Sequence, residues 1–353
     1  MTDDFASPHA DAAVLRILDA NANRGAEGLR VVEEFVRFVL DDRHLTALCK
    51  QLRHDLAEAM RRLPASGLLA ARETQADVGT TITAGAEFDR ATARDVAVAS
   101  MKRVEQSLRC LEEYGKTVSA EFAAAVEALR YRAYTLHRAV AIADDSRARL
   151  QGARLYVLID GAATAGAFAV RAQSLVAAGV HVLQLRDKRL TDRELLARAR
   201  MLRQITAGTS TLFVLNDRPD LAALAHADGV HVGQDELSVK EVRAIVGPEM
   251  LIGVSTHSIE QARRAVLDGA NYLGCGPTFP SGTKEFREFP GIDFLRQVSQ
   301  EISLPAFAIG GITAENLRLV RAAGFCRVAV SGAVADATEP VAAARQLLAW
   351  LAE

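Results

Sequence analysis

The sequence predicts an α/β protein in which a (β/α)8 TIM barrel follows an all-α helical-bundle domain. From about Arg154 onward, short Val/Leu-rich runs alternate with amphipathic helical segments, whereas residues before about 145 contain many helix formers and few strand-like runs. A third observation, an internal repeat, lies within the first half. We therefore expect a helical domain over residues 1–145 and a barrel over residues 146–353, with AIADDSRARLQGA (141–153) joining them.

The first half repeats itself at an offset of 79 residues. NRGAEGLRVVEEFVRF (23–38) aligns with KRVEQSLRCLEEYGKT (102–117), so that Arg30 matches Arg109 and the pair Glu33-Glu34 matches Glu112-Glu113. The echo continues from Arg53 to Arg132. Within the first copy, the apolar residues Leu29, Val32, Val36 and Leu40 recur at helical spacing. We expect two copies of a helical pair, about 21–60 and about 100–139, packed as a pseudo-symmetric bundle.

The second half contains eight runs that predict strands. Each run is short, apolar and continuous, which is typical of parallel strands that are buried on both faces. In chain order they are RLYVLID (154–160), VHVLQLR (180–186), TLFVLND (211–217), GVHVG (229–233), LIGVST (251–256), YLGCGP (272–277), PAFAIGG (305–311) and RVAVSG (327–332). Segments such as DRELLARARMLRQITAG (192–208) between them predict the covering helices.

Composition and charge exclude several classes of function. The net charge is −2 over 353 residues, so no overall field favours nucleic acid or an anionic membrane as a partner. The four cysteines are far apart in the sequence and form no metal-binding spacing. We find no basic-then-apolar leader and no apolar run that approaches the length of a membrane span. We expect a cytoplasmic protein that acts on small molecules.

Polar residues follow seven of the eight predicted strands. The carboxyl ends of the strands form the functional face of a TIM barrel, so these residues are expected to meet there. Gln184, Arg186 and Lys188 project the same way if the strand continues, because side chains alternate between faces. Together with Lys284 they predict a site for a highly charged anion such as a diphosphate.

Two further groups of residues predict a metal ion and a second phosphate. Asp217 and the pair Asp235-Glu236 offer oxygen ligands at adjacent strand ends, which suits Mg²⁺ shared with substrate phosphates. The dipeptides Gly310-Gly311 and Ser331-Gly332 follow the last two strands, where barrels bind phosphate with backbone N–H groups. Thr313 is the expected N-cap of the next helix. His257 is expected to be structural and held by a backbone group.

With these residues assembled, the barrel half resembles the thiamine-phosphate synthases, also called thiamine-phosphate pyrophosphorylases. The motifs QLRDK, ND, DGVHVGQDEL, GVSTH, GCGPTFPSGTK, AIGGI and VAVSGAV occur in the order found in that family. The resemblance implies a transferase that joins a hydroxymethylpyrimidine diphosphate to a hydroxyethylthiazole phosphate and releases pyrophosphate. It further implies a dissociative, Mg²⁺-assisted substitution.

The resemblance also assigns site residues. The residues implied to hold the pyrimidine diphosphate are Gln184, Arg186, Lys188, Asn216, Ser255 and Lys284, of which Arg186, Lys188 and Lys284 are the catalytic cations. Those implied to hold the thiazole phosphate are Ser281, Gly282, Thr283, Gly311, Ser331 and Gly332. Asp217 is implied as one Mg²⁺ ligand. The second maps to Glu236, although Asp235 remains an alternative because the family often has a variable residue followed by Asp at these two positions.

The helical half resembles a domain found in front of some bacterial thiamine-phosphate synthases and described as an alternative hydroxymethylpyrimidine phosphate kinase. The matching pieces are DANANRGAEGLRVVEEFVRF, LRHDL and ADVGTT. No GxxxxGK[ST] phosphate loop is present. The charged residues Arg24, Glu27, Arg30, Glu33, Glu34 and Arg37 lie at spacings that suit ion pairs within a bundle. A pocket for a phosphorylated pyrimidine that includes His54 and Asp77, or a surface for homo-oligomerisation, stay open as functional alternatives.

Two other functions remain to be distinguished for the barrel. A thiazole tautomerase would need the thiazole-phosphate site but not the diphosphate-binding cations. A non-catalytic sensor of phosphorylated ligands, with the helical half as its interaction module, would bind product without turnover or Mg²⁺ dependence.

Overall fold

The computed structural model describes residues 12–82, 89–280 and 290–352. Contacts between Cα atoms divide the chain into two compact units, one up to Ala141 and the other from Ile142 onward. Within the described ranges, no helix combines the length and the hydropathy that crossing a membrane requires. All four cysteines are free, and Cys49 and Cys275 are buried.

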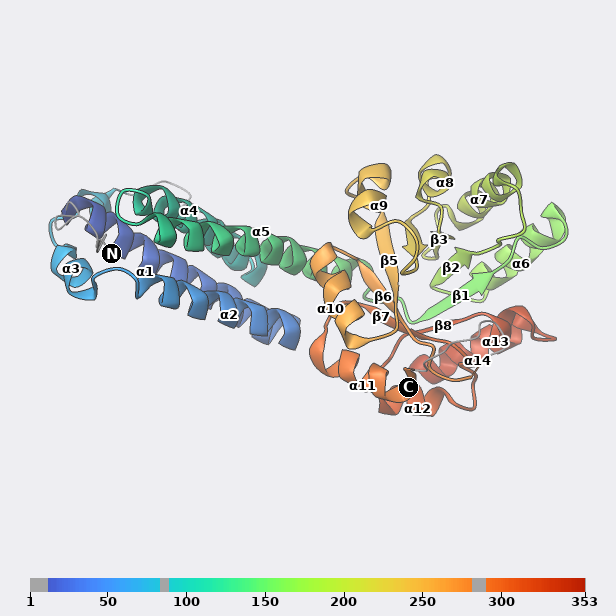
Figure 1. Cartoon of the computed structure of the whole chain (residues 1–353). Coiled ribbons are helices and arrows are strands. Elements are labelled where there is room, and N and C mark those ends of the chain that lie inside the picture. Colours follow the sequence, from blue (N-terminus) through green and yellow to red (C-terminus); the bar gives the residue numbers. More distant parts are fainter. Residues whose placement is uncertain (1–11, 83–88, 281–289, 353) are drawn as a thin grey trace, which may run out of the picture. The chain divides into compact units, whose positions relative to one another are not determined.

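The second unit is a closed barrel of eight parallel strands (Figure 1). The strands follow one another around the barrel in chain order, and β8 pairs with β1 to close it. Their bounds are β1 Leu155–Ile159, β2 Val182–Leu185, β3 Leu212–Asn216, β4 Gly229–Val232, β5 Leu251–Thr256, β6 Tyr272–Cys275, β7 Ala306–Ile309 and β8 Val328–Val330. All eight predicted strands, and with them the predicted TIM barrel, are confirmed.

Helices cover the outside of the barrel. Their bounds are α6 Ala165–Ala177, α7 Asp192–Thr206, α8 Pro219–Leu224, α9 Val239–Val246, α10 Ile259–Asp268, α11 Gly291–Glu301, α12 Leu317–Ala322, α13 Gly332–Ala335 and α14 Pro340–Ala352. Local sequence sets where several of them begin. Thr191 and Glu194 form a capping box at the start of α7, and Ser238 and Glu241 form another at the start of α9.

The interior of the barrel is filled by every second residue of each strand. The interior cluster is Leu150, Ala153, Tyr156, Val182, Val214, Leu251, Tyr272, Phe307 and Ala329. Leu150 and Ala153 precede β1, so they belong to the end of the barrel at which the strands begin. Because the alternation continues along each strand, the interior positions nearest the carboxyl ends fall on residues such as Gln184 and Ser255.

The first unit consists of long helices. Their bounds are α1 Ala12–Phe35, a π-helical segment η1 Val36–Leu40, α2 Arg43–Met60, α3 Ala65–Ala71, a 3₁₀ turn η2 Val78–Thr81, α4 Ala93–Gly115 and α5 Ala120–Arg149, the end of α5 belonging to the second unit. The predicted stripe Leu29, Val32, Val36 and Leu40 is buried along its whole length. Beyond Phe35 the helix widens to a π-helix, which the spacing alone does not predict.

The internal repeat is visible in how α1 and α4 cross. A Cβ atom on Gly28 would lie 2.8 Å from Cγ2 of Val104, and one on Gly25 would lie 3.6 Å from Cβ of Ser107. In the repeat, Gly25 is equivalent to Val104 and Gly28 to Ser107. The two contacts are therefore exchanged by the repeat, which is the pattern of a two-fold axis between equivalent helices.

Candidate active site

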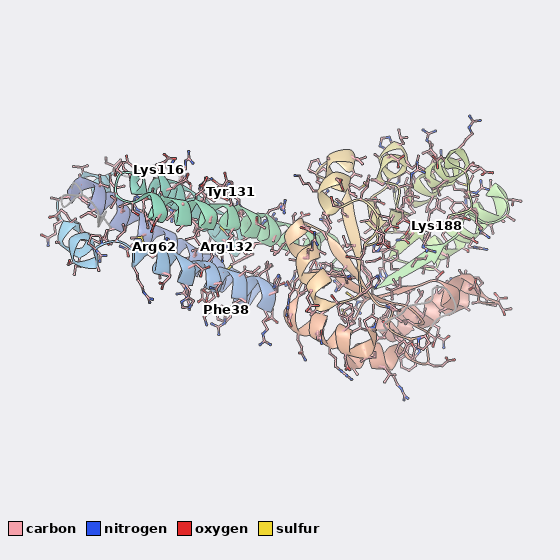
Figure 2. All side chains as sticks on the ribbon, viewed as in Figure 1. Phe38, Arg62, Lys116, Tyr131, Arg132 and Lys188 are labelled. Atoms are coloured by element: carbon pink, nitrogen blue, oxygen red, sulfur yellow. The ribbon has the colours of Figure 1, made fainter. Side chains whose placement is uncertain are left out.

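Exposure to solvent increases from Gln184 to Lys188 at the end of β2. Gln184 is buried, and its Nε2 donates a hydrogen bond to the hydroxyl of Tyr156 inside the barrel, 2.7 Å away. The strand ends at Leu185, and Arg186 is partly buried. The Lys188 side chain is 59% exposed at the rim (Figure 2). The three residues thus extend from the interior of the barrel to its rim.

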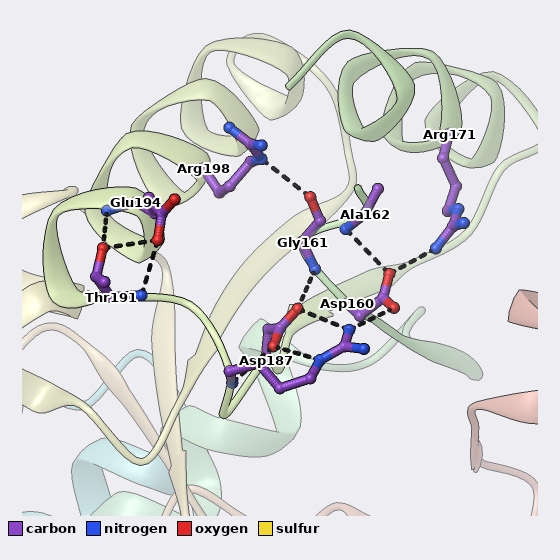
Figure 3. Close-up of polar contacts among 9 residues, drawn as sticks. Asp160, Gly161, Ala162, Arg171, Asp187, Thr191, Glu194 and Arg198 are labelled. Atoms are coloured by element: carbon purple, nitrogen blue, oxygen red, sulfur yellow. Dashed lines mark hydrogen bonds and ion pairs between the residues drawn. The ribbon is translucent and has the colours of Figure 1, made fainter. Parts of the chain in front are cut away.

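The Asp187 carboxylate ties the end of β2 to the loop after β1 (Figure 3). Its carboxylate accepts hydrogen bonds from the backbone N–H of Gly161 at 3.1 Å and of Arg189 at 2.9 Å. The Arg189 guanidinium also bridges Asp187 to Asp160, both at 3.2 Å. Although burial alone would raise it, hydrogen bonds from the Arg189 side chain and from both backbone groups bring the pKa of Asp187 below its ordinary value. This network fixes the backbone on both sides of Lys188.

A cavity opens beside this network. Its volume is about 390 Å³, and it lies at the carboxyl ends of β1, β2 and β8. Among its lining residues are Arg186, Lys188 and Ser331, so it joins one predicted substrate site to the other. Arg171 also lines it and is held by Asp160 at 2.8 Å.

The predicted metal ligands lie at the ends of β3 and β4. Asp217 has a positive φ of 61°, its N–H donates to the carbonyl oxygen of His231, and its carboxylate lies 3.2 Å from Nζ of Lys188. The Glu236 side chain lies over Gly233, because a Cβ atom added to Gly233 would lie 2.4 Å from Oε2 of Glu236. Asp235 is exposed.

The two predicted carboxylate ligands would suit only an open kind of Mg²⁺ site. In the part of the chain that the structure describes, no three His, Cys, Asp or Glu residues form a group able to hold a metal ion. Two carboxylates on neighbouring strands suit an ion that completes its coordination with water and substrate phosphates, which is how Mg²⁺ is commonly held. They do not suit a closed, all-protein cage.

Three residues that the sequence reasoning did not single out lie beneath these groups. His231 Nε2 is 2.9 Å from Oγ of Ser255, and its Nδ1 is 3.3 Å from the hydroxyl of Tyr272. That hydroxyl is 3.1 Å from the hydroxyl of Tyr156. Burial lowers the pKa of His231 to about 4 and raises the pKa values of both tyrosines. The sequence signal that could have identified Tyr156, His231 and Tyr272 is that each places a ring with a polar group inside an otherwise apolar run.

The predicted thiazole-phosphate residues are only partly described. Gly310 and Gly311 have φ values of 97° and 62°, and Cβ atoms there would lie 2.7 Å from Cα of Pro277 and from the carbonyl oxygen of Pro280. Glycine is therefore required at both positions by packing alone. Ser331 and Gly332 lie at the start of α13. Ser281, Gly282, Thr283 and Lys284 lie outside the described residues.

One expectation about this region is wrong. Thr313 does not cap a helix, because α12 begins only at Leu317. The side chain of Asn316 accepts a hydrogen bond from the N–H of Thr313 and donates one to the carbonyl oxygen of Gly311. These bonds hold a turn that delays the helix. His257 behaves as expected, since its Nδ1 is hydrogen-bonded to the carbonyl oxygen of Gly276.

The charged residues of the helical unit form paired ion-pair sets. Arg30 contacts Glu33 and Glu34, and the equivalent Arg109 contacts Glu112 and Glu113. The predicted ion pairs are confirmed for these residues, whereas Arg24, Glu27 and Arg37 are exposed. His54 is exposed on α2, and Asp77 caps η2 and pairs with Arg16 at 3.4 Å.

Comparisons with known proteins match each of the two halves of the chain to a family. The family model described as thiamine monophosphate synthase matches residues 155–334, and the ThiD2 family model matches residues 16–139. A thiamine-phosphate synthase of Rhodopirellula baltica is 51% identical over 331 residues, covering 91% of this chain and 88% of the relative. Another, of Gloeobacter violaceus, is 42% identical and covers 94% of each chain. A solved thiamine phosphate pyrophosphorylase from Pyrococcus furiosus is 30% identical, with a TM-score of 0.52, and covers 58% of this chain and 98% of its own.

Proposed function

The chain belongs to the thiamine monophosphate synthase family, whose members are transferases, and we propose a specific reaction for its barrel. In this reaction 4-amino-2-methyl-5-(diphosphooxymethyl)pyrimidine and 4-methyl-5-(2-phosphooxyethyl)thiazole give thiamine phosphate and pyrophosphate. The observation that carries the proposal is the meeting of Lys188 and Asp217 at the mouth of the barrel, 3.2 Å apart. A cation beside a carboxylate that is proposed to hold Mg²⁺ suits a leaving diphosphate.

The proposed substitution is dissociative. The bond between the pyrimidine methylene carbon and the diphosphate oxygen breaks, and both electrons leave with pyrophosphate. The amino group of the ring stabilises the resulting cation, and the thiazole nitrogen then supplies the electron pair of the new carbon–nitrogen bond. Such a step needs stabilisation of the leaving group and correct positioning of the acceptor more than it needs a strong base.

Each predicted site residue then has a proposed role. Arg186 and Lys188 contact the diphosphate, with Lys284 as a third cation. Gln184, Asn216 and Ser255 contact the pyrimidine diphosphate from inside the barrel mouth. The thiazole phosphate lies against Gly311, Ser331 and Gly332, together with Ser281, Gly282 and Thr283. The shared cavity between β2 and β8 supports this arrangement, because it brings Lys188 and Ser331 to one space.

Mg²⁺ is proposed as the cofactor. Asp217 and Glu236 would hold the ion, with Asp235 as the alternative to Glu236. When bound, Mg²⁺ would neutralise charge on the departing pyrophosphate. The protein's own contribution is to hold the Asp217 carboxylate beside Lys188.

The test uses the full chain with both substrates and Mg²⁺, and it measures thiamine phosphate and pyrophosphate. We expect equal amounts of the two products, a requirement for Mg²⁺, and a loss of activity of at least about a hundredfold in Lys188→Ala. Lys240→Ala, which removes an exposed lysine of α9, is the matched control and should leave the rate unchanged. A folded chain that binds thiamine phosphate but makes none would overturn the proposal and favour the sensor. Tautomerisation of a thiazole phosphate without condensation would favour the tautomerase.

A further inference from the structure

Five side chains form a continuous hydrogen-bonded chain across the interior of the barrel. The chain runs from Gln184 on β2 through Tyr156 on β1, Tyr272 on β6 and His231 on β4 to Ser255 on β5. Its four links measure 2.7, 3.1, 3.3 and 2.9 Å. Both ends are residues proposed above to contact the pyrimidine diphosphate, while the three middle residues have no proposed contact with substrate.

The chemistry of the groups gives this chain a direction. The carboxamide nitrogen of Gln184 can only donate, so the Tyr156 hydroxyl accepts a hydrogen bond from it and donates its own O–H to the hydroxyl oxygen of Tyr272. Tyr272 accepts in turn and donates to Nδ1 of His231. A neutral imidazole that accepts at Nδ1 carries its proton on Nε2, and this N–H donates to Oγ of Ser255. The Ser255 proton is then left to be donated elsewhere.

The surroundings are shaped to hold the two central rings. A Cβ atom on Gly253 would lie 2.1 Å from Cζ of Tyr272 and 2.5 Å from Nδ1 of His231. One on Gly274 would lie 3.1 Å from Cε1 of His231. Glycines at these two interior strand positions therefore make the space that the rings fill.

Aromatic packing further restricts the tyrosines. Phe307 stands edge-on to Tyr156 and Tyr272, with ring centroids 5.2 and 5.8 Å apart. The Tyr156 and Tyr272 side chains are almost fully buried, at 3% and 2% exposure, so solvent does not compete for their hydroxyl groups. Rings held in this way keep their hydroxyl oxygens beside the same hydrogen-bond partners.

We propose that this chain is a relay of fixed hydrogen-bond direction that makes Ser255 a donor toward the pyrimidine diphosphate, with His231, Tyr272 and Tyr156 as positioning residues. The ligand atom that meets Ser255 must then be a hydrogen-bond acceptor, and Gln184 keeps its carbonyl oxygen to accept from a donor on the ligand. The inference rests on the proposed function, because it assigns specificity to that same site.

The test is a double-mutant cycle in the full chain, with KM for each substrate and kcat as readouts. Tyr272→Phe removes the hydroxyl but keeps the ring. His231 can then carry its proton on Nδ1 and accept at Nε2 a hydrogen bond from the Ser255 hydroxyl, which is no longer directed toward the substrate. We expect KM for the pyrimidine diphosphate to rise about tenfold, while KM for the thiazole phosphate changes less than about twofold. In a Ser255→Ala background, the Tyr272→Phe change should raise KM by less than about twofold, because its effect passes through Ser255.

Controls separate this role from simple packing. Phe307→Leu disturbs the same aromatic cluster without breaking the relay, so it should lower the unfolding temperature but leave KM unchanged. Nitrogen-15 NMR of labelled histidine should find the His231 proton on Nε2 in the wild type, with the resonance identified by its loss in His231→Gln. A proton on Nδ1 would overturn the inference.

The kinetic outcomes distinguish the two proposals. A wild-type chain that makes no thiamine phosphate overturns the proposed function and this inference with it. An active wild type in which Tyr272→Phe leaves KM unchanged, or raises it equally with and without Ser255, overturns the relay alone.

Discussion

Asp187 should be the most sensitive carboxylate at the rim of the barrel, although it has no proposed contact with substrate. The substitution Asp187→Asn keeps the size of the side chain but replaces one acceptor oxygen by a donor. The carboxylate accepts at one oxygen from the N–H of Arg189 and at the other from the N–H of Gly161. An amide can satisfy only one of these two backbone groups, and its own N–H₂ then faces the other.

The size of the effect follows from burial. The Asp187 side chain is only 2% exposed, so an amide N–H₂ that faces a backbone donor at this position has little access to solvent. Leaving one such group unsatisfied costs about 1–3 kcal/mol, and the loss of charge opposite Arg189 acts in the same direction. For a unit of this size that corresponds to a fall of about 2–12 °C in unfolding temperature. Because the network fixes the backbone around Lys188, we also expect KM for the pyrimidine diphosphate to rise on the order of tenfold.

The assays are thermal unfolding and steady-state kinetics on the full chain, with Asp160→Asn as the matched control. Asp160 belongs to the same network, but its side chain is 44% exposed, so its substitution should cost less than about 1 kcal/mol. Equal stability of Asp187→Asn and wild type, or equal effects of the two substitutions, would show that the buried carboxylate does not anchor the rim.

The pH dependence gives a second check on the same group. The folded-state pKa of Asp187 lies below its ordinary value of 3.8, so its contribution to stability is present above that value and is lost as the pH falls through the folded-state pKa. Wild type should therefore lose more stability than Asp187→Asn between neutral pH and about pH 3. Parallel curves over that range would contradict the assignment.

Three further predictions concern other parts of the barrel. Asn271→Ala removes a buried amide that accepts from the Ile252 N–H at 2.9 Å and from Arg243 at 2.7 Å, so urea unfolding should show a loss of about 2–4 kcal/mol. Gly310→Ala places a Cβ atom 2.7 Å from Cα of Pro277 at a φ of 97° and should cost more than about 2 kcal/mol, whereas Gly166→Ala in α6, where no atom lies within 4 Å, should be neutral or stabilising. Asp217→Asn tolerates the positive φ and should raise the Mg²⁺ concentration for half-maximal rate by at least about tenfold, whereas Asp220→Asn on α8 should not change it.

The fold of the barrel could be predicted because its strands carry an unusually direct signal. Strands covered on both faces need apolar residues at nearly every position, so runs such as TLFVLND are recognisable without knowledge of their neighbours. Helix starts depend on smaller differences. Thr313 has the right residue type for an N-cap, but the Asn316 side chain accepts a hydrogen bond from the backbone N–H of Thr313 and holds a turn there instead. The local sequence pattern is compatible with a helix that begins after Thr313 and with such a turn.

The outer part of the candidate site could likewise be located, because the fold brings all carboxyl ends of the strands to one face. The inner part could not. Whether Tyr272 and His231 meet depends on the register of β4, β5 and β6, in which His231 pairs with Gly253 and Gly253 with Tyr272. The sequence alone does not show that Gly253 lies between the rings of His231 and Tyr272, because that placement follows only from the register. The relay is therefore a property of the closed barrel and not of any one motif.

The two copies of the repeat in the helical unit are only partly equivalent in structure. Its two halves keep the same arginine–glutamate pairs, yet the second partner of the buried carboxylate differs: Glu33 contacts Arg53 of α2, whereas Glu112 contacts Arg130 of α5. Arg132, the equivalent of Arg53, instead pairs with Asp55 at 2.6 Å. The bundle is thus symmetric where α1 crosses α4 and asymmetric around its buried carboxylates.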